Sequence, residues 1–148
     1  MEPWPSRFMA SARDLFPVTQ TTVDAVYELI FAPWLKEIGL TDFKIEPGRA
    51  SARLPEADHL KFRNGGVCGQ ALMAAIDTVA VLAVATGDKE IKGTAYQHTQ
   101  FLRSARGDDM IVTAEVLRAG KSTAYVDTRI TFVGSGALVA HAVLEFAF

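Results

Sequence analysis

The sequence predicts an α+β fold in which one curved antiparallel sheet wraps around a long buried helix. Two observations lead to this prediction. Residues 67–85 read VCGQALMAAIDTVAVLAVA, which is small or apolar on nearly every side of a helix, and such a helix is normally buried. After Gly87, four segments show the partial apolar and polar alternation of strands that bury one face. With 148 residues and 49% hydrophobic content, the chain is long enough for one domain and too short for two.

The N-terminal part of the chain predicts a helix outside the sheet. Apolar residues at 23–30 follow helical spacing behind Thr22, a residue type that caps helices. Pro33 should bend or restart this helix. We therefore expect residues 1–39 to form an extension that packs on a single domain at 40–148.

Strands are expected on both sides of the long helix. A short pair at 42–45 and 50–54 should turn at Pro47-Gly48. The later strands should run over residues 94–103, 110–118, 123–133 and 137–146. The connections ARGDD, AGKS and GSG are rich in turn residues, so we expect a meander in which each strand pairs with the next. One face should pack on the core and the other should be more polar.

Asp77 is the one acid inside the long apolar segment. An ionised carboxylate that is buried without partners costs several kcal/mol, so its place here requires an explanation. Asp77 is either a local hydrogen-bonding residue where the helix meets solvent, or a carboxylate that the helix delivers to a functional site. The residue alone leaves both interpretations open.

Composition excludes several classes of protein. The net charge is −2 and the basic residues are scattered, which argues against nucleic acid as a partner. One cysteine and three separated histidines predict no internal disulfide and no metal site, and we expect no cofactor. The apolar segment is interrupted well before the ~20 residues that a membrane span needs. The N-terminus lacks the pattern of a secretory signal, so we expect a cytoplasmic protein.

Two long runs resemble the hotdog-fold acyl-CoA thioesterases, in particular their phenylacetate-pathway (PaaI-like) branch. They are FRNGGVCGQALMAAIDTVAVLA and TAYQHTQFLRSARGDDMIVTAEVLRAGKSTAYVDTRITFVGSGALVAHA. The resemblance covers about residues 40–148 and implies a hotdog fold and hydrolysis of an acyl-CoA thioester. It also implies a homodimer or a dimer of dimers, hence a homotetramer, with active sites at the subunit interface.

The resemblance assigns the candidate catalytic residues. In the family, the helix begins with His-Gly-Gly and carries an Asp nine residues after the His. Asp77 matches that acid, whereas Cys68-Gly69-Gln70 stands at the His-Gly-Gly element and keeps only its central glycine.

Two further catalytic candidates and a binding set follow from the same resemblance. Asn64 matches an Asn before the helix when the loop is shortened by two residues, and Thr94 matches a small hydroxyl residue on the next strand. An apolar pocket beside the acid favours an apolar or aromatic acyl group. The expected substrate-binding residues are Cys68, Gln70, Leu72, Met73, Ile76, Arg103 and Lys121, the two basic ones toward CoA phosphates.

These residue types suit thioester hydrolysis. The backbone N–H of Gly69 at a helix start would polarise the carbonyl, together with the positive end of the helix dipole. Asp77 would act as general base or as nucleophile, and the sequence does not choose between them. Gly69 and Asp77 are eight residues apart, about 12 Å along one helix, so a shared site needs Asp77 from a partner subunit.

Other functions remain as alternatives. A non-catalytic acyl-CoA-binding hotdog protein is the main one, because Cys68 and Gln70 depart from the family pattern. Cys68 itself has no neighbouring His in the sequence, so a small buried residue is a better interpretation of it than a nucleophile. A dehydratase is disfavoured, because it would need a His paired with an acid and Cys68 stands where the family has its His. A hotdog transcription regulator is disfavoured, because it would need a DNA-binding helical domain that the short N-terminal segment does not supply.

Overall fold

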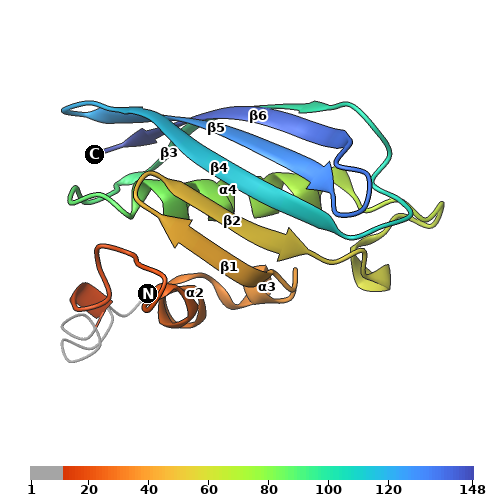
Figure 1. The fold of residues 1–148 in the computed structure, drawn as a ribbon, viewed down its shortest axis with the longest axis horizontal. Coiled ribbons are helices and arrows are strands. Elements are labelled where there is room, and N and C mark those ends of the chain that lie inside the picture. Colours follow the sequence, from red (N-terminus) through yellow and green to blue (C-terminus); the bar gives the residue numbers. More distant parts are fainter. Residues whose placement is uncertain (1–11) are drawn as a thin grey trace.

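The computed structural model describes residues 12–148 and has an α+β architecture (Figure 1). The first elements are α2 (Val23–Ile30), α3 (Pro33–Lys36), β1 (Thr41–Glu46) and β2 (Arg49–Leu54). A 3-10 turn at Asp58–Leu60 then leads to the long helix α4 (Gly69–Val84). The remaining strands are β3 (Gly93–Phe101), β4 (Met110–Ala119), β5 (Thr123–Phe132) and β6 (Leu138–Ala147). Residues 1–11, the start of the predicted extension, lie outside the described part.

All six strands form one antiparallel sheet in the order β1-β2-β4-β5-β6-β3. The sheet packs on α4, which contacts every strand (Figure 1). Burying an apolar helix against the apolar face of one sheet is the layer arrangement that the sequence predicts. The predicted fold class is confirmed.

The prediction of a four-stranded meander is wrong for β3, which pairs with β6 and not with β4. The connection after β3 is not a hairpin. Ala105 accepts a hydrogen bond from the N–H of Val67 (3.0 Å), and the N–H of Gly107 donates to Glu56 Oε1 (2.9 Å). These contacts carry the chain across to β2, so β4 pairs with β2 on one side and with β5 on the other.

The alternation predicted for 123–133 is confirmed in β5. Its inward side chains at Ala124, Val126, Thr128 and Ile130 are buried, and Tyr125 and Arg129 on the other face are exposed. One of the inward side chains is polar. The hydroxyl of Thr128 is fully buried and has no hydrogen-bond partner among the described residues.

The N-terminal helices pack on the β1 side of the sheet (Figure 1). Val23 and Val26 of α2 belong to the same hydrophobic core as α4. Pro33 begins α3 after α2 has ended at Ile30, as the sequence predicts. Thr22 occupies the N-cap position of α2 but makes no side-chain cap; its hydroxyl accepts a hydrogen bond from the N–H of Thr19 (3.0 Å).

The two edges of the sheet differ in how they are covered. At the β1 edge the side-chain amide of Gln20 donates to the carbonyl of Phe43 (2.7 Å) and accepts from the N–H of Ile45 (2.8 Å). It therefore satisfies backbone groups that a neighbouring strand would otherwise bind. At the β3 edge, large side chains remain open, and Tyr96 and Phe101 are each 50% exposed.

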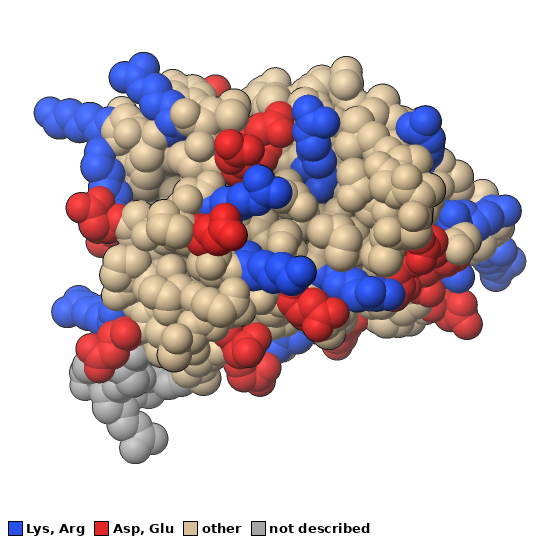
Figure 2. All heavy atoms as spheres, viewed as in Figure 1, with Lys and Arg blue, Asp and Glu red and all other residues tan. Residues whose placement is uncertain are grey.

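The hydropathy of the helices and the distribution of surface charge can both be compared with the sequence analysis. Within residues 12–148, no helix is long and apolar enough to cross a membrane. Figure 2 shows that positive and negative side chains are interspersed over the face in view, without a large region of one sign.

The buried hydroxyl of Thr128 should weaken the fold. Thr128→Val keeps the shape of the side chain and removes a polar atom without a partner, so the free energy of unfolding should rise by about 1 kcal/mol. Thr78→Val is the control, because the Thr78 hydroxyl donates to the carbonyl of Ala74 (2.8 Å) and its removal brings no such gain. Urea denaturation of both variants measures the difference, and a destabilised Thr128→Val would contradict the assignment.

Candidate functional site

Asp77 and Thr94 meet on the inner side of the sheet. The hydroxyl of Thr94 on β3 donates a 2.7 Å hydrogen bond to Oδ1 of Asp77 on α4. Burial raises the pKa of the Asp77 carboxyl above its ordinary value, and the hydrogen bond from Thr94 opposes part of that rise. A raised pKa makes the ionised carboxylate a stronger base than an ordinary Asp, which suits proton transfer from water.

One side of α4 is left open by its own sheet, and Asp77 lies on it. Gln70, Met73, Ala74 and Val81 share that side, at helical spacing, and all are at least partly exposed. The apolar sequence of this helix gave no indication of an open side. The carboxylate is therefore held at the boundary of the core and not inside it.

The start of α4 is the second part of the candidate site. Gly69 is its first residue, and the Gly69 N–H has no hydrogen-bond acceptor among residues 12–148. The ring of Phe101 lies against this glycine, because a Cβ added at Gly69 would come within 3.2 Å of Cζ of the ring. A side chain at this position would press on the ring of Phe101, whereas glycine leaves room for it.

The two parts lie at the start and in the middle of the same helix, against opposite ends of the same strand. β3 runs antiparallel to α4: Thr94 binds Asp77, the Gln97 amide lies 3.4 Å from the carbonyl of Met73, and Phe101 packs on Gly69. Within one chain, Asp77 and Gly69 are therefore about 12 Å apart along the helix and do not meet.

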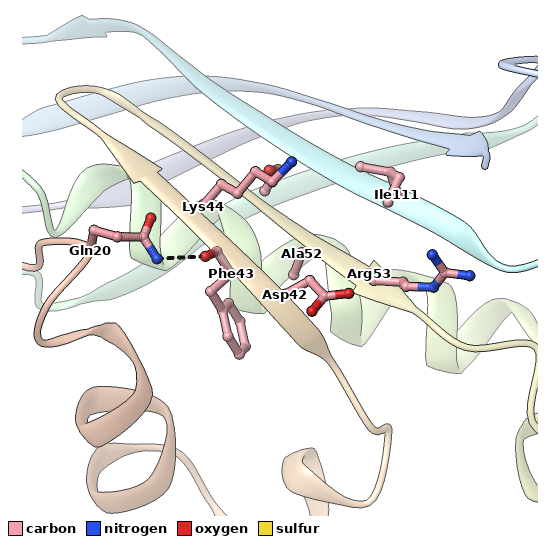
Figure 3. A pocket seen from close by; sticks show the side chains of 8 residues that line it. Gln20, Asp42, Phe43, Lys44, Ala52, Arg53 and Ile111 are labelled. Atoms are coloured by element: carbon pink, nitrogen blue, oxygen red, sulfur yellow. Dashed lines mark hydrogen bonds between the residues drawn. The ribbon is translucent and has the colours of Figure 1, made fainter.

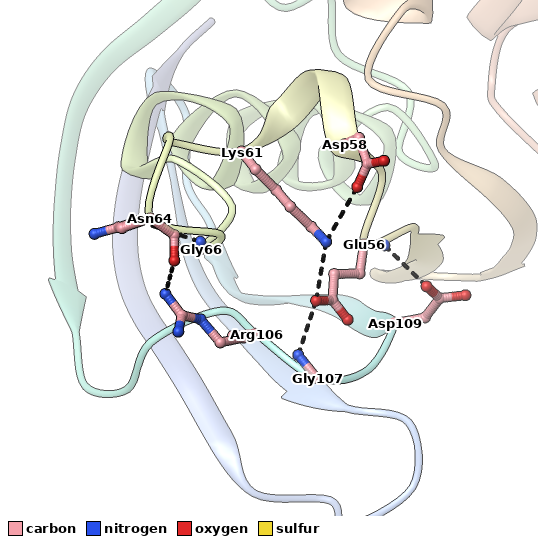
Figure 4. Close-up of polar contacts among 8 residues, drawn as sticks. All are labelled: Glu56, Asp58, Lys61, Asn64, Gly66, Arg106, Gly107 and Asp109. Atoms are coloured by element: carbon pink, nitrogen blue, oxygen red, sulfur yellow. Dashed lines mark hydrogen bonds and ion pairs between the residues drawn. The ribbon is translucent and has the colours of Figure 1, made fainter.

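Asn64 lies at the Gly69 end, in the loop before α4. Its Oδ1 accepts a hydrogen bond from the N–H of Gly66 (3.4 Å), and its backbone carbonyl accepts one from the guanidinium of Arg106 (Figure 4). Within this chain Asn64 is not brought beside Asp77. The contact of Arg106 with Asn64 was not predicted, because the sequence carries no local signal for it.

The five predicted substrate-binding residues in and beside α4 separate into three groups. Gln70 and Met73 lie on the open side of α4, and Cys68 is its half-buried N-cap residue. Leu72 and Ile76 are 3% and 0% exposed and pack in the core, so the structure does not bring them to the open side. The reason is helical rotation: about 100° per residue separates Leu72 from Met73 and Ile76 from Asp77.

The two basic candidates lie at opposite ends of the sheet. Arg103 follows β3 and donates to the carbonyl of Leu138 (2.8 Å), whereas Lys121 lies in the turn between β4 and β5. A single chain does not bring them to one ligand.

Two features do not contribute to the candidate site. His98 pairs with Val143 on the outer face of the sheet, away from α4. A groove of about 560 Å³ is lined by residues around β1 and β2, with Gln20, Lys44 and Arg53 among them (Figure 3), and includes none of the predicted site residues. Among the described residues no three His, Cys, Asp or Glu side chains gather as metal ligands.

Comparisons with known proteins give one family match and several structural matches. Residues 64–135 match the thioesterase superfamily. Zebrafish thioesterase superfamily member 2 superposes with a TM-score of 0.80 at 18% identity, over 88% of this chain and 98% of that one. The E. coli PaaI protein, from the phenylacetic acid degradation operon, gives 0.73 at 22% identity, over 86% and 90%.

A third solved structure was determined with a ligand. The Streptococcus mutans protein smu.793, bound to acetyl CoA, gives a TM-score of 0.67 at 19% identity, over 74% of this chain and 87% of that one. No curated protein gives a significant match. The family match confirms the resemblance to the thioesterase superfamily, and the superpositions confirm the hotdog fold.

The pKa of Asp77 should depend on Thr94. Thr94→Val removes the donor that lowers the pKa, so the carboxyl should titrate at still higher pH, as measured by ¹³C NMR. Thr99→Val is the control, since the Thr99 hydroxyl binds Gln97 and not the acid. An equal pKa in both variants would contradict the assignment.

The sign of the stability effect follows from the same shift. The folded protein binds the Asp77 proton more tightly than the unfolded chain does, because the pKa is raised on folding. The Asp77 contribution to stability therefore grows as pH falls through the raised folded pKa toward the ordinary value, and it is absent above that window. Asp77→Asn should lose this part of the pH dependence in urea denaturation.

Proposed function

We propose that this chain, which has the hotdog fold of the thioesterase superfamily, hydrolyses an acyl-CoA thioester to a free acid and CoA. The observation that carries the proposal is the arrangement of α4. It presents a basic carboxylate, Asp77, at mid-helix and a free backbone N–H, Gly69, at its start. Acyl-CoA as the substrate class is supported by the acetyl CoA bound to smu.793.

Gly69 and Asp77 have different roles in the proposed reaction. The Gly69 N–H and the positive end of the helix dipole stabilise the negative charge that develops on the thioester oxygen. Asp77 accepts a proton from water as the oxygen attacks the carbonyl, and the proton passes to the CoA sulfur when the C–S bond breaks. Alternatively, Asp77 attacks the carbonyl itself, the C–S bond breaks and CoA leaves as the thiolate. Water then hydrolyses the resulting anhydride to the free acid and the Asp77 carboxylate, and the released proton goes to the thiolate. Thr94 orients the carboxylate, and Asn64 holds the water or the thioester.

A complete site requires two chains, because Asp77 and Gly69 are too far apart within one. The open edge of β3 supplies the contact: two copies can pair antiparallel through this strand about a two-fold axis. An axis at His98 pairs Gln97 with the partner's Thr99 on the face toward α4. Because of the bulge between Thr94 and Tyr96, it also places Thr94 opposite the partner's Phe101. Each Asp77 then faces Gly69 of the partner subunit, so the dimer has two sites.

The remaining assignments are also part of the proposal. The acyl group is apolar or aromatic and lies against the open side of α4, beside Met73. Arg103 and Lys121 contact CoA phosphates, from different chains, because they lie at opposite ends of one sheet. Each dimer holds two complete sites, so the homotetramer is an assembly of two such dimers. Residues 1–39 form an extension of the domain at 40–148, and the single thiol of Cys68 suits the cytoplasm.

The alternative is a hotdog protein that binds acyl-CoA without hydrolysing it. Cys68 and Gln70 favour this function, since they replace the His and the second Gly of the family element. Cys68 is not a good substitute nucleophile, because no described His, Asp or Glu side chain hydrogen-bonds to its thiol.

A hydrolysis screen combined with Asp77→Asn separates the two functions. The parent should release free thiol from at least one of a set of short, medium, long and aryl acyl-CoAs. Asp77→Asn should lower kcat at least about a hundredfold, because the base or nucleophile is lost. Binding of an unreactive acyl-CoA analogue should stay within a few-fold, and the free energy of unfolding should be unchanged or higher.

Asp88→Asn, the same change at an exposed site after α4, should leave turnover at the parent level. Hydrolysis by Asp77→Asn at the parent rate would contradict the mechanism. Binding of the analogue by a parent that hydrolyses none of the esters would favour the binding protein.

A mixed dimer tests whether the site is shared. Asp77→Asn and Gly69→Val chains should each be inactive alone, since bulk at Gly69 clashes with Phe101 and blocks its N–H. A heterodimer purified through two different tags keeps one intact pair, Gly69 from one chain and Asp77 from the other. It should regain about half of the parent turnover per dimer. An inactive heterodimer of correct size, or an active monomer in sedimentation, would show that the site is not shared.

A further inference from the structure

The loop that carries Asn64 is a short hairpin in front of α4. The N–H of Phe62 donates to the carbonyl of Gly66 (2.8 Å), and the N–H of Gly65 donates to the carbonyl of Phe62 (3.0 Å). Gly65 has a φ of +92°, in the left-handed region that favours glycine. These two backbone hydrogen bonds close the turn. Neither involves the backbone carbonyl of Asn64, which therefore needs a donor from another part of the chain.

Arg106, from the connection between β3 and β4, supplies that contact (Figure 4). Its Nη2 donates a hydrogen bond to the backbone carbonyl of Asn64. A Cβ placed at Gly65 would lie 3.6 to 3.7 Å from Nη2, Cζ and Nε of Arg106. Because the three atoms are nearly equidistant, the flat face of the guanidinium lies over Gly65. A side chain there would meet the arginine.

The backbone around Arg106 also lies along the loop. Ala105, which is buried, accepts a hydrogen bond from the N–H of Val67 (3.0 Å). The hydroxyl of Ser104 lies 3.3 Å from the Cβ position of Gly66. The connection is held in turn by Glu56, which accepts from the N–H of Gly107 and pairs with Lys61 (3.2 Å) (Figure 4). Arg106 therefore reaches Asn64 from an anchored segment.

We infer that Arg106 is a positioning residue that holds Asn64 at the Gly69 end of the site. By fixing the carbonyl of Asn64 and covering Gly65, it limits the directions that the Asn64 side chain can take. The inference rests on the proposed function, in which Asn64 holds the water or the thioester. Displacement of such a group by about 1 Å can lower a rate by about a hundredfold.

The contact depends on the shape of the guanidinium as well as on its charge. Arginine is flat and offers several N–H donors in a fixed plane, whereas lysine is a compact charge on a flexible stem. Lysine at this position would keep the charge and lose the face that covers Gly65. Arg106→Lys is therefore expected to behave like Arg106→Gln and not like the parent.

Arg63 provides a matched control from the same loop. It precedes Asn64 and is exposed, and it forms no hydrogen bond or ion pair with another described residue. Arg63→Gln removes the same charge from the same end of the molecule without touching the contact to Asn64.

Amide hydrogen exchange tests the structural step. Arg106→Gln and Arg106→Lys should increase exchange at Phe62, Gly65 and Gly66 about tenfold, because the loop opens more often once its outer contact is lost. Arg63→Gln should leave exchange unchanged, and the melting temperatures of the three variants should stay close to that of the parent. Unchanged exchange in Arg106→Gln would overturn the inference.

Steady-state kinetics test the functional step. With the acyl-CoA identified by the screen, both Arg106 variants should lose about tenfold in kcat, with little change in KM. Arg63→Gln should match the parent in kcat. In an Asn64→Ala background, Arg106→Gln should cause little further loss, because Arg106 acts through Asn64. Additive losses, or a loss of activity equal to the loss of folded protein, would overturn the inference.

The two measurements separate failure of the inference from failure of the proposed function. A parent that hydrolyses none of the esters contradicts the proposed function, and exchange alone then decides whether Arg106 holds the Asn64 loop. An active parent in which Arg106→Gln loosens the loop but keeps kcat overturns only the positioning role.

Discussion

The antiparallel course of β3 along α4 is the constraint on which the candidate site depends. Thr94, Gln97 and Phe101 contact α4 at successive turns, from Asp77 at mid-helix to Gly69 at the helix start. The acid and the helix start are thus fixed by the same strand. A shift of β3 by two residues along the helix would break both contacts together, so the two parts of the candidate site move as one.

The features that form the candidate site also lower the stability of the fold. A carboxylate at the boundary of an apolar core is disfavoured in its charged form, as its raised pKa shows, and the Thr94 hydroxyl compensates only in part. The open side of α4 also leaves apolar surface such as Met73 uncovered. Both features reduce the stability of an isolated chain, and both become useful when a second surface covers the helix.

The sequence was sufficient for most elements because their signals are local. Apolar periodicity and turn residues located α4 and β1 to β6 within a few residues, and Pro33 marked the break between two helices. The pairing of β3 with β6 was not predictable, because it depends on contacts of the 102–109 connection with distant loops.

The candidate site was predictable in part, for the same reason. Asp77 stood out by its apolar neighbours, but a helix without a polar face does not reveal which side remains open. Leu72 and Ile76 were therefore assigned to the pocket, although they face the core. The contact of Arg106 with Asn64 joins positions 42 residues apart and leaves no pattern in the sequence.

The glutamine at position 20 has a consequence for the size of the assembly. Its amide occupies the backbone groups of β1 at Phe43 and Ile45, so within residues 12–148 the β3 edge is the one left open for pairing. A chain with two free edges could add copies without limit, as in a fibril. Two chains joined through β3 would instead form a continuous twelve-stranded layer that ends in a blocked strand on each side, and growth by strand addition would stop there.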